Sequence, residues 1–239
     1  MTSRKEPWAL VHARIDHIPF KRYEQLLNMA DVVPRVMEGV ASDDVCAGYC
    51  MGKMRADDYP RHPEKLVKSA GVLDLVQTDV MGPIQTRTTG GCIFGVTFID
   101  DYSRHVTVFF MKAKSEVLSK FRIYKAAMEK ATGTTIKRLR SDNGGEYTDK
   151  LFKAYLNLNG IKHEKTVPHT PQQNGLAERM NRSLVEMARC MLYHEGIHKK
   201  WRVESANTAA WIINRIPNSV NIKTPYEIVN KANPQLKNL

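Results

Sequence analysis

Apolar and polar residues form two different patterns along the chain, and these patterns predict where strands and helices lie. Short runs rich in β-branched and aromatic residues, bounded by turn residues, are typical of strands. Such runs occupy residues 73–80, 92–101, 105–112, 135–142 and 161–167. Apolar residues spaced three and four apart are typical of helices. They occur over residues 20–28, 115–131, 151–159, 176–195 and 199–214. Three strands followed by alternating helices and strands predict an α/β domain with a mixed sheet.

The long helix predicted at 176–195 has two unlike faces. Successive residues of a helix are about 100° apart around its axis. One side is apolar and is predicted to be buried; it carries Leu176, Met180, Leu184, Met187 and Met191. The opposite side carries Glu178, Arg182, Val185 and Arg189. The pattern therefore predicts an exposed acid, Glu178, on a stripe that also bears arginines.

Three acidic residues lie where one site could gather them. Asp79 is at the end of the first strand of the predicted sheet and Asp142 at the end of the fourth. If these strands are parallel neighbours, their carboxylates meet at one sheet edge. Glu178 follows near the start of the long helix. Carboxylate oxygens bind hard divalent cations, and two such cations can assist phosphoryl transfer. Glu178 alone would be read as a solvated surface acid, but the three acids together favour a metal site.

Two histidines and two cysteines near the N-terminus suggest a zinc site. His12 and His17, followed by Cys46 and Cys50, supply the ligand set of a tetrahedral structural zinc ion. In a reducing compartment a close cysteine pair is better interpreted as metal ligands than as a disulfide. We therefore expect a small helical zinc-binding module in residues 1–55, whereas a histidine pair alone would more often be surface residues. The polar, proline-containing residues 56–70 are predicted to be a linker.

The net charge of the chain indicates which class of molecule it binds. The formal net charge is +11, and residues 179–239 hold ten lysines and arginines against four acids. This favours a polyanionic partner such as nucleic acid, although a merely basic surface would show the same excess. No uninterrupted apolar run is long enough for a membrane span, and residues 1–20 lack the apolar core of a signal peptide. We expect an intracellular protein without membrane contact.

Four segments carry a resemblance to a known family: LVQTDVMGP, FIDDYSRH, RLRSDNGGEY and HTPQQNGLAERMNRSLVEMAR. They resemble the integrase core of copia-type (Pseudoviridae) LTR retrotransposons. The 35 residues between Asp142 and Glu178 match the D,D-35-E signature that these proteins share with retroviral integrases. Further on, WRVESANTAAWIINRIPN and KTPYEI are similar to the region that follows the core. The resemblance covers about residues 12–239 and implies an RNase H-like core at 71–217 and the start of a post-core segment at 218–239.

The resemblance also implies roles for individual residues. It assigns Mg²⁺ or Mn²⁺, as a two-metal site, to Asp79, Asp142 and Glu178. It places the Gln172–Gly175 loop (Gln172, Gln173, Asn174, Gly175) and Arg182 where relatives meet the DNA end of the element; Arg179 and Arg189 are expected to add phosphate contacts. Relatives carry an HHCC zinc module before the core. Here the second cysteine is displaced by one position, with Tyr49 at its usual place.

The implied function is DNA integration. An integrase of this kind is a polynucleotidyl transferase that processes the 3′ ends of the element's cDNA and joins them to target DNA in the nucleus, as a homo-oligomer on DNA. A bacterial-type transposase of the same fold fits less well, because of the His/Cys module and KTPYEI. A truncated or domesticated protein that only binds nucleic acid stays open. The altered zinc module favours it, as does the end of the chain soon after KTPYEI, where family polyproteins continue.

Overall fold

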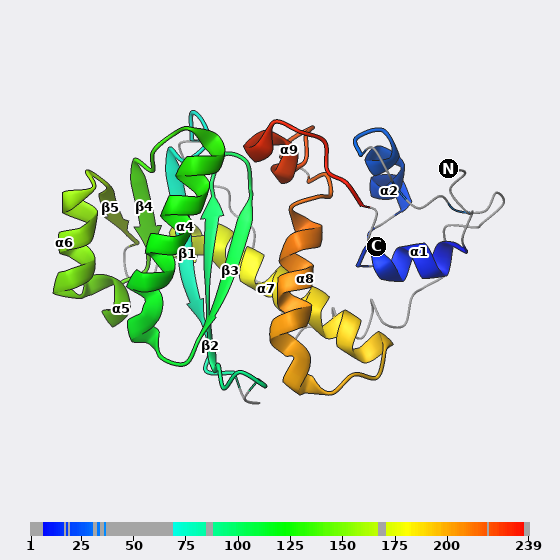
Figure 1. Ribbon diagram of the computed structural model, residues 1–239, viewed down its shortest axis with the longest axis horizontal. Coiled ribbons are helices and arrows are strands. Elements are labelled where there is room, and N and C mark those ends of the chain that lie inside the picture. Colours follow the sequence, from blue (N-terminus) through cyan, green and yellow to red (C-terminus); the bar gives the residue numbers. More distant parts are fainter. Residues whose placement is uncertain are drawn as a thin grey trace.

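The protein is built around one five-stranded mixed sheet (Figure 1). The computed structural model describes residues 7–16, 18, 20–30, 33, 36, 69–84, 88–166, 171–218 and 220–236. The strands are β1 (Leu75–Met81), β2 (Phe94–Asp100), β3 (Val106–Met111), β4 (Arg138–Ser141) and β5 (Lys162–Lys165). Their order is β3-β2-β1-β4-β5; β1, β2 and β3 pair antiparallel, whereas β1 with β4 and β4 with β5 pair parallel. The predicted mixed sheet is confirmed.

The helices largely occupy the predicted segments. They are α1 (Trp8–Arg14), α2 (Phe20–Leu27), the 3-10 turn η1 (Lys114–Glu116), α4 (Val117–Thr132), α5 (Gly145–Thr148), α6 (Lys150–Leu158), α7 (Pro171–His194), the 3-10 turn η2 (Lys199–Trp201), α8 (Arg202–Ile213) and α9 (Pro225–Asn230). The expected start of α7 at residue 176 was wrong, since the helix begins at Pro171, a residue type that is favoured in the first turn. No helix in these described ranges is long and apolar enough to cross a membrane.

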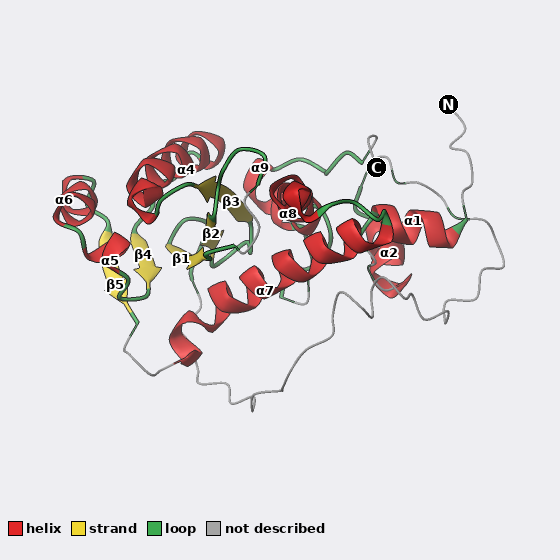
Figure 2. Ribbon diagram, turned by 90° about the horizontal axis from the view of Figure 1, so that it is seen from below, coloured by secondary structure: helices red, strands yellow, loops and turns green. Residues whose placement is uncertain are grey.

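Helices cover both faces of the sheet. Figure 2 shows α4, α5 and α6 on one face, while α7 crosses the other and continues beyond the sheet. On the first face, the Phe98 ring stacks on Tyr124 with 4.9 Å between centroids. On the second face, Ile99 packs with Ala177 and Leu184 of α7. Because neighbouring residues of a strand point to opposite faces, adjacent positions of β2 serve both cores.

The buried face of α7 differs from the predicted one. Ala177, Asn181, Leu184 and Ala188 are buried and form one stripe along the helix. The predicted core residues Leu176, Met180, Met187 and Met191 are only partly buried, and they pack around the edge of this stripe. Two alanines in the stripe allow the helix to approach the sheet closely, so that the longer methionines fill space to the side. Glu178, Arg182 and Val185 are exposed as predicted, and Arg189 is partly exposed.

The two N-terminal helices pack against the far end of the core domain. Val11 of α1 and Leu26 of α2 lie in one apolar cluster with Ile212 of α8, Ile216 and Leu236. The same cluster is joined at its edge by Met187 of α7, and Figure 1 shows α1 and α2 on the side of α7 and α8 that is remote from the sheet. The N-terminal helices, the end of α8 and the post-core segment thus share one core.

A side-chain amide joins the end of α8 to the edge of the sheet. Asn214 is 6% exposed; its Oδ1 accepts the N–H of Val106 at 2.8 Å, and its Nδ2 donates to the Val106 carbonyl at 2.7 Å. The amide therefore occupies the place that a neighbouring strand would take beside β3, which lies at the edge of the sheet. Both backbone groups of Val106 are satisfied by this one side chain.

We expect Asn214→Ala to lower the free energy of unfolding by about 2 to 4 kcal/mol, because it removes two hydrogen bonds and leaves buried backbone groups of Val106 without partners. Urea denaturation followed by circular dichroism measures the change. Asn230→Ala is the matched control: that amide also donates to a backbone carbonyl, but it is exposed, so its loss should change stability by less than about 0.5 kcal/mol. Equal losses in the two variants would contradict this account.

Candidate active site

Asp79 lies on the face of the sheet that α7 covers. It is the fifth residue of β1, two residues before the end of the strand, where the sequence predicted the end itself. The parallel register pairs Gln77 with Arg140, and the same register continued by two residues sets Asp79 opposite Asp142. Asp142 follows directly after β4. The predicted meeting of these two acids at one sheet edge therefore agrees with the register.

A buried amide from α7 orients the Asp79 carboxylate. Asn181 Nδ2 donates to Asp79 Oδ2 at 2.8 Å, and Asn181 Oδ1 accepts the Thr97 hydroxyl proton at 2.7 Å. The two contacts leave the amide one orientation, with its nitrogen toward the acid. We did not single out Asn181 from the sequence. The feature that could have identified it in the sequence is a polar residue at a position of α7 that faces the sheet, three residues after Glu178.

The other two predicted acids act electrostatically on Asp79. The pKa of Asp79 is raised from 3.8 to about 6, chiefly by burial and then by the negative charges of Asp142 and Glu178, while hydrogen bonds from the Val80 backbone and Asn181 oppose the rise. Glu178 itself is exposed on α7. A carboxylate that is disfavoured by its neighbours in this way is one that a cation would stabilise.

The turn after β4 brings in a fourth acid. Asp142 Oδ1 accepts the Gly144 N–H at 3.0 Å. A Cβ at position 144 would lie 2.9 Å from the Glu146 carboxyl carbon and 3.0 Å from Asp142 Oδ1, so both carboxylates crowd this glycine. Lys114 Nζ contacts Glu146 Oε1 at 3.1 Å and offsets its charge. Sequence reasoning missed Glu146, although it lies only four residues from Asp142.

The acids supply suitable oxygen donors for a divalent cation, but they are not yet arranged as a closed ligand group. Among the described residues, no three His, Cys, Asp or Glu side chains are close enough to form such a group. The acidic side chains nevertheless fit a hard cation in chemical type, and the pKa of Asp79, raised first by burial and then by the neighbouring acids, marks a carboxylate that such a cation would stabilise. Asp79, Asp142 and Glu178 could therefore hold the metal.

The residues predicted to contact DNA all belong to α7. Gln172, Gln173, Asn174 and Gly175 lie in its first turns, so the expected loop was wrong at these positions. The side chains of Gln172, Gln173 and Asn174 lie outside the described part. A Cβ at Gly175 would be 2.9 Å from the Arg179 guanidinium, so that arginine folds back over the glycine.

The predicted zinc ligands are described only in part. The His12 Nδ1 atom lies 3.1 Å from the Ile18 carbonyl oxygen, and burial lowers the pKa of the ring, which favours the neutral imidazole. His17, Cys46 and Cys50 lie outside the described residues, as does most of the predicted linker.

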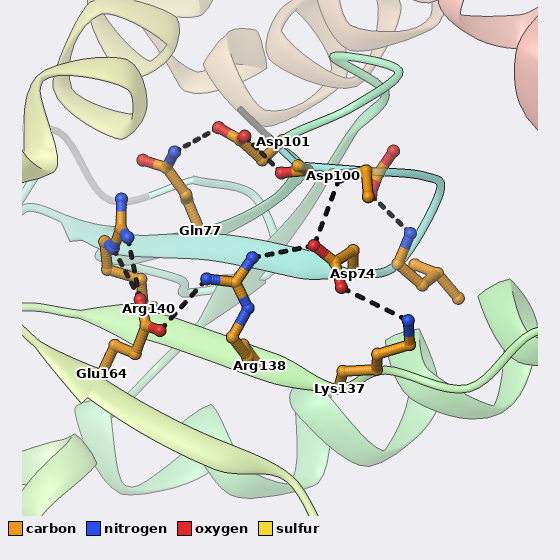
Figure 3. Close-up of polar contacts among 11 residues, drawn as sticks. Asp74, Gln77, Asp100, Asp101, Lys137, Arg138, Arg140 and Glu164 are labelled. Carbon is orange, nitrogen blue, oxygen red and sulfur yellow. Dashed lines mark hydrogen bonds and ion pairs between the residues drawn. The ribbon is translucent and has the colours of Figure 1, made fainter. Parts of the chain in front are cut away.

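A second polar network lies on the sheet near the candidate site, and it is internally paired (Figure 3). Arg138 bridges Asp74 at 2.8 Å and Glu164 at 3.2 Å, and Arg140 contacts Glu164 at 2.8 Å. Gln77 Nε2 donates to Asp101 Oδ1 at 2.6 Å. The two arginines link β4 to β5 and to Asp74, which precedes β1, while Gln77 links β1 to the turn after β2. The two arginines are thus engaged by acids within the fold.

Residues 70–171 match the family described as the integrase core domain. The chain carries an integrase core domain. It is 46% identical over 170 residues to the retrovirus-related Pol polyprotein from transposon TNT 1-94 of Nicotiana tabacum, and 36% identical over 133 residues to that from transposon RE2 of Arabidopsis thaliana. These matches cover 71% and 55% of the chain, but only 13% and 9% of the polyproteins. The resemblance to copia-type proteins is confirmed.

Solved integrase structures share the fold of this integrase core domain. A chain of the simian T-cell lymphotropic virus intasome, in complex with the PP2A regulatory subunit B56 gamma, has a TM-score of 0.59 and 18% identity, with 81% of this chain and 68% of that chain covered. The HTLV-2 integrase catalytic core domain in complex with magnesium has a TM-score of 0.53 and 19% identity, with 67% and 99% covered. The RNase H-like fold that the sequence implied is confirmed.

The raised pKa of Asp79 predicts a pH-dependent effect of Asp79→Asn. Between pH 3.8 and about 6 the folded state binds more protons at this residue than the unfolded state, so the wild type loses stability as pH rises through that window. The uncharged amide of the variant removes that loss. In EDTA, we expect Asp79→Asn to be more stable than the wild type by about 1 to 3 kcal/mol at pH 8 and nearly equal to it at pH 4.

Urea denaturation at the two pH values measures this difference. Glu195→Gln serves as the control, because that acid is exposed just beyond the end of α7. A stability gain of Asp79→Asn that is the same at pH 4 and pH 8 would contradict the proposed electrostatic origin.

Proposed function

We propose that this chain acts as the catalytic core of a retrotransposon integrase, a polynucleotidyl transferase that processes the 3′ ends of element cDNA and joins them to target DNA. The observation that supports this most is the raised pKa of Asp79, caused by burial and then by the negative charges of Asp142 and Glu178, within an integrase core domain. An acidic cluster on a basic chain suits a polyanionic substrate that reacts with the help of cations.

Each acid has a distinct task in this proposal. Asp79 is the fixed member, because Asn181 sets its orientation. Asp142 is held by the Gly144 N–H. Glu178 is exposed and would be the third carboxylate to hold the metal. Bound Mg²⁺ or Mn²⁺ would supply Lewis acidity and would lower the pKa of a coordinated water or 3′-hydroxyl.

The arginines of α7 would hold the DNA beside these acids. Arg179 and Arg182 are exposed and follow Glu178 closely on the helix, so their guanidinium groups suit the flanking phosphates. Gln172, Gln173, Asn174 and Gly175 are proposed to meet the DNA end. No side-chain nucleophile is required, because water and the DNA 3′-hydroxyl attack in turn.

Similar proteins support a proposal for the cofactor, the oligomeric state and the location of the reaction. Because one similar core was solved with magnesium and another within an intasome, we propose a divalent cation as cofactor and a homo-oligomer assembled on DNA as the active form. The reaction would take place inside the cell, in the nucleus.

Asp142→Asn tests the mechanism. With Mg²⁺ or Mn²⁺ and a labelled duplex, the wild type should nick the end and join it to a second duplex. The variant should lose at least about 100-fold in rate, because one anionic metal ligand is gone. Asp149→Asn is the matched control: Asp149 caps α6 by accepting the Leu151 N–H, a role that asparagine performs equally well.

The possible results separate the two functions. Activity that survives Asp142→Asn would refute the assigned mechanism. Binding of DNA by the wild type without any product would instead favour a nucleic-acid-binding protein that lacks integration activity.

We also propose that His12, His17, Cys46 and Cys50 bind a structural zinc ion. The contact of His12 Nδ1 with the Ile18 carbonyl supports this, because a backbone acceptor at one ring nitrogen commonly orients a histidine that ligates zinc through the other.

Metal analysis of the purified chain should find about one zinc per molecule. Cys46→Ser and His12→Ala should each reduce that content strongly, because a four-ligand site loses one donor. Cys92→Ser, which alters a cysteine of the sheet domain, should leave it unchanged. Zinc content that is equal in all four proteins would refute the site.

A further inference from the structure

A basic groove lies at the end of α7 that is remote from Glu178. It has a volume of about 440 Å³ and is formed where α7 turns through η2 into α8. Three cationic side chains line it, one from each element: Arg189, Lys199 and Arg202. We call it the distal groove. Tyr193 and Ile197 contribute to its walls, so the cations stand beside partly apolar surface.

The cations of the distal groove have no acidic partners within the described part of the chain. No ion pair joins Arg189, Lys199 or Arg202 to a described acid. The Nε atom of Arg202 is buried and donates to no acceptor there. A charged donor without an acceptor is unfavourable, so the charge of the Arg202 guanidinium is not compensated there and is available to an anion in the groove. Arg138 and Arg140 on the sheet differ in this respect, because acids within the fold engage both.

The distal groove lies in line with the candidate active site. Glu178, Arg182 and Arg189 fall within about 40° of one another around α7, since successive residues are about 100° apart. Arg189 is eleven residues beyond Glu178, which corresponds to about 16 Å along the helix axis. That length equals about five base pairs of duplex at 3.4 Å each. One rigid polyanion could therefore reach both places.

We propose that the distal groove binds the phosphate backbone of a DNA duplex, about five base pairs from the phosphate that faces Asp79, Asp142 and Glu178. The inference rests on the proposed function, because it takes that duplex as the substrate. Three cations without acidic partners favour phosphodiesters, whose charges are closely and regularly spaced. An acidic peptide is the alternative ligand, and the apolar walls would suit it.

Salt-dependent binding tests the groove without requiring catalysis. In EDTA, fluorescence anisotropy of a labelled duplex of about 20 base pairs gives the association constant at several salt concentrations. The triple variant Arg189→Gln, Lys199→Gln, Arg202→Gln should reduce the slope of log K against log salt by about 2 to 3, because each lost phosphate contact removes about 0.9. The charge-keeping variant Arg189→Lys, Lys199→Arg, Arg202→Lys should keep the wild-type slope.

The matched control removes the same charge elsewhere. Lys130, Lys150 and Lys153 are exposed on α4 and α6, on the other face of the sheet, and their triple change to Gln should alter the slope by less than about 1. Equal reductions in the two triple variants would overturn the proposal, as would a polyglutamate peptide that binds the wild type as tightly as the duplex does and loses its binding in the groove variant.

The outcomes also separate this inference from the proposed function. Asp142→Asn should keep the wild-type slope, because its carboxylate is not a phosphate contact. If the groove variant reduces the slope of log K against log salt but the wild type never nicks DNA, the distal groove is supported and the catalytic role is refuted. End nicking with an unchanged slope in the groove variant would refute the groove alone.

Discussion

The amide of Asn181 fixes the relation between α7 and the sheet, on which the rest of the site depends. It is 7% exposed and is held between the Thr97 hydroxyl and the Asp79 carboxylate. A buried polar group tolerates no rotation that breaks its bonds. Glu178 lies three residues before Asn181, about 60° away around the helix, on the exposed flank of the sheet-facing stripe, and Arg182 and Arg189 fall on the same flank. One hydrogen-bonded position therefore orients a helix of 24 residues.

The charges of the candidate site oppose folding, so packing and hydrogen bonds elsewhere in the domain have to stabilise the fold. Asp79 is disfavoured as a carboxylate by burial and by Asp142 and Glu178. The opposing contributions come from the aromatic packing of Phe98 on Tyr124 and from the Asn214 clamp on β3, both of which involve neutral groups. Strain of this kind is common where a site awaits a charged ligand. The fold holds the acids near one another before any cation offsets their repulsion.

The sequence predicted the sheet well because alternation and turn residues are local properties. The nearness of Asp79 and Asp142 followed as well, because parallel neighbouring strands end at the same edge. The partners of these acids could not be predicted in the same way. Asn181 is 102 residues from Asp79 and Lys114 is 32 residues from Glu146, so only the completed fold brings each pair together. The one-turn helix α5 was missed because four residues show no period. Helix α9 carried a readable signal, the Thr224 cap before Pro225.

The shared core of α1, α2 and Leu236 has a topological consequence. Residues from the first and the last described parts of the chain pack into one cluster, on the side of α7 and α8 that is remote from the sheet. Loss of that cluster would release the first helices and the post-core segment together, whereas both faces of the sheet keep apolar clusters of their own.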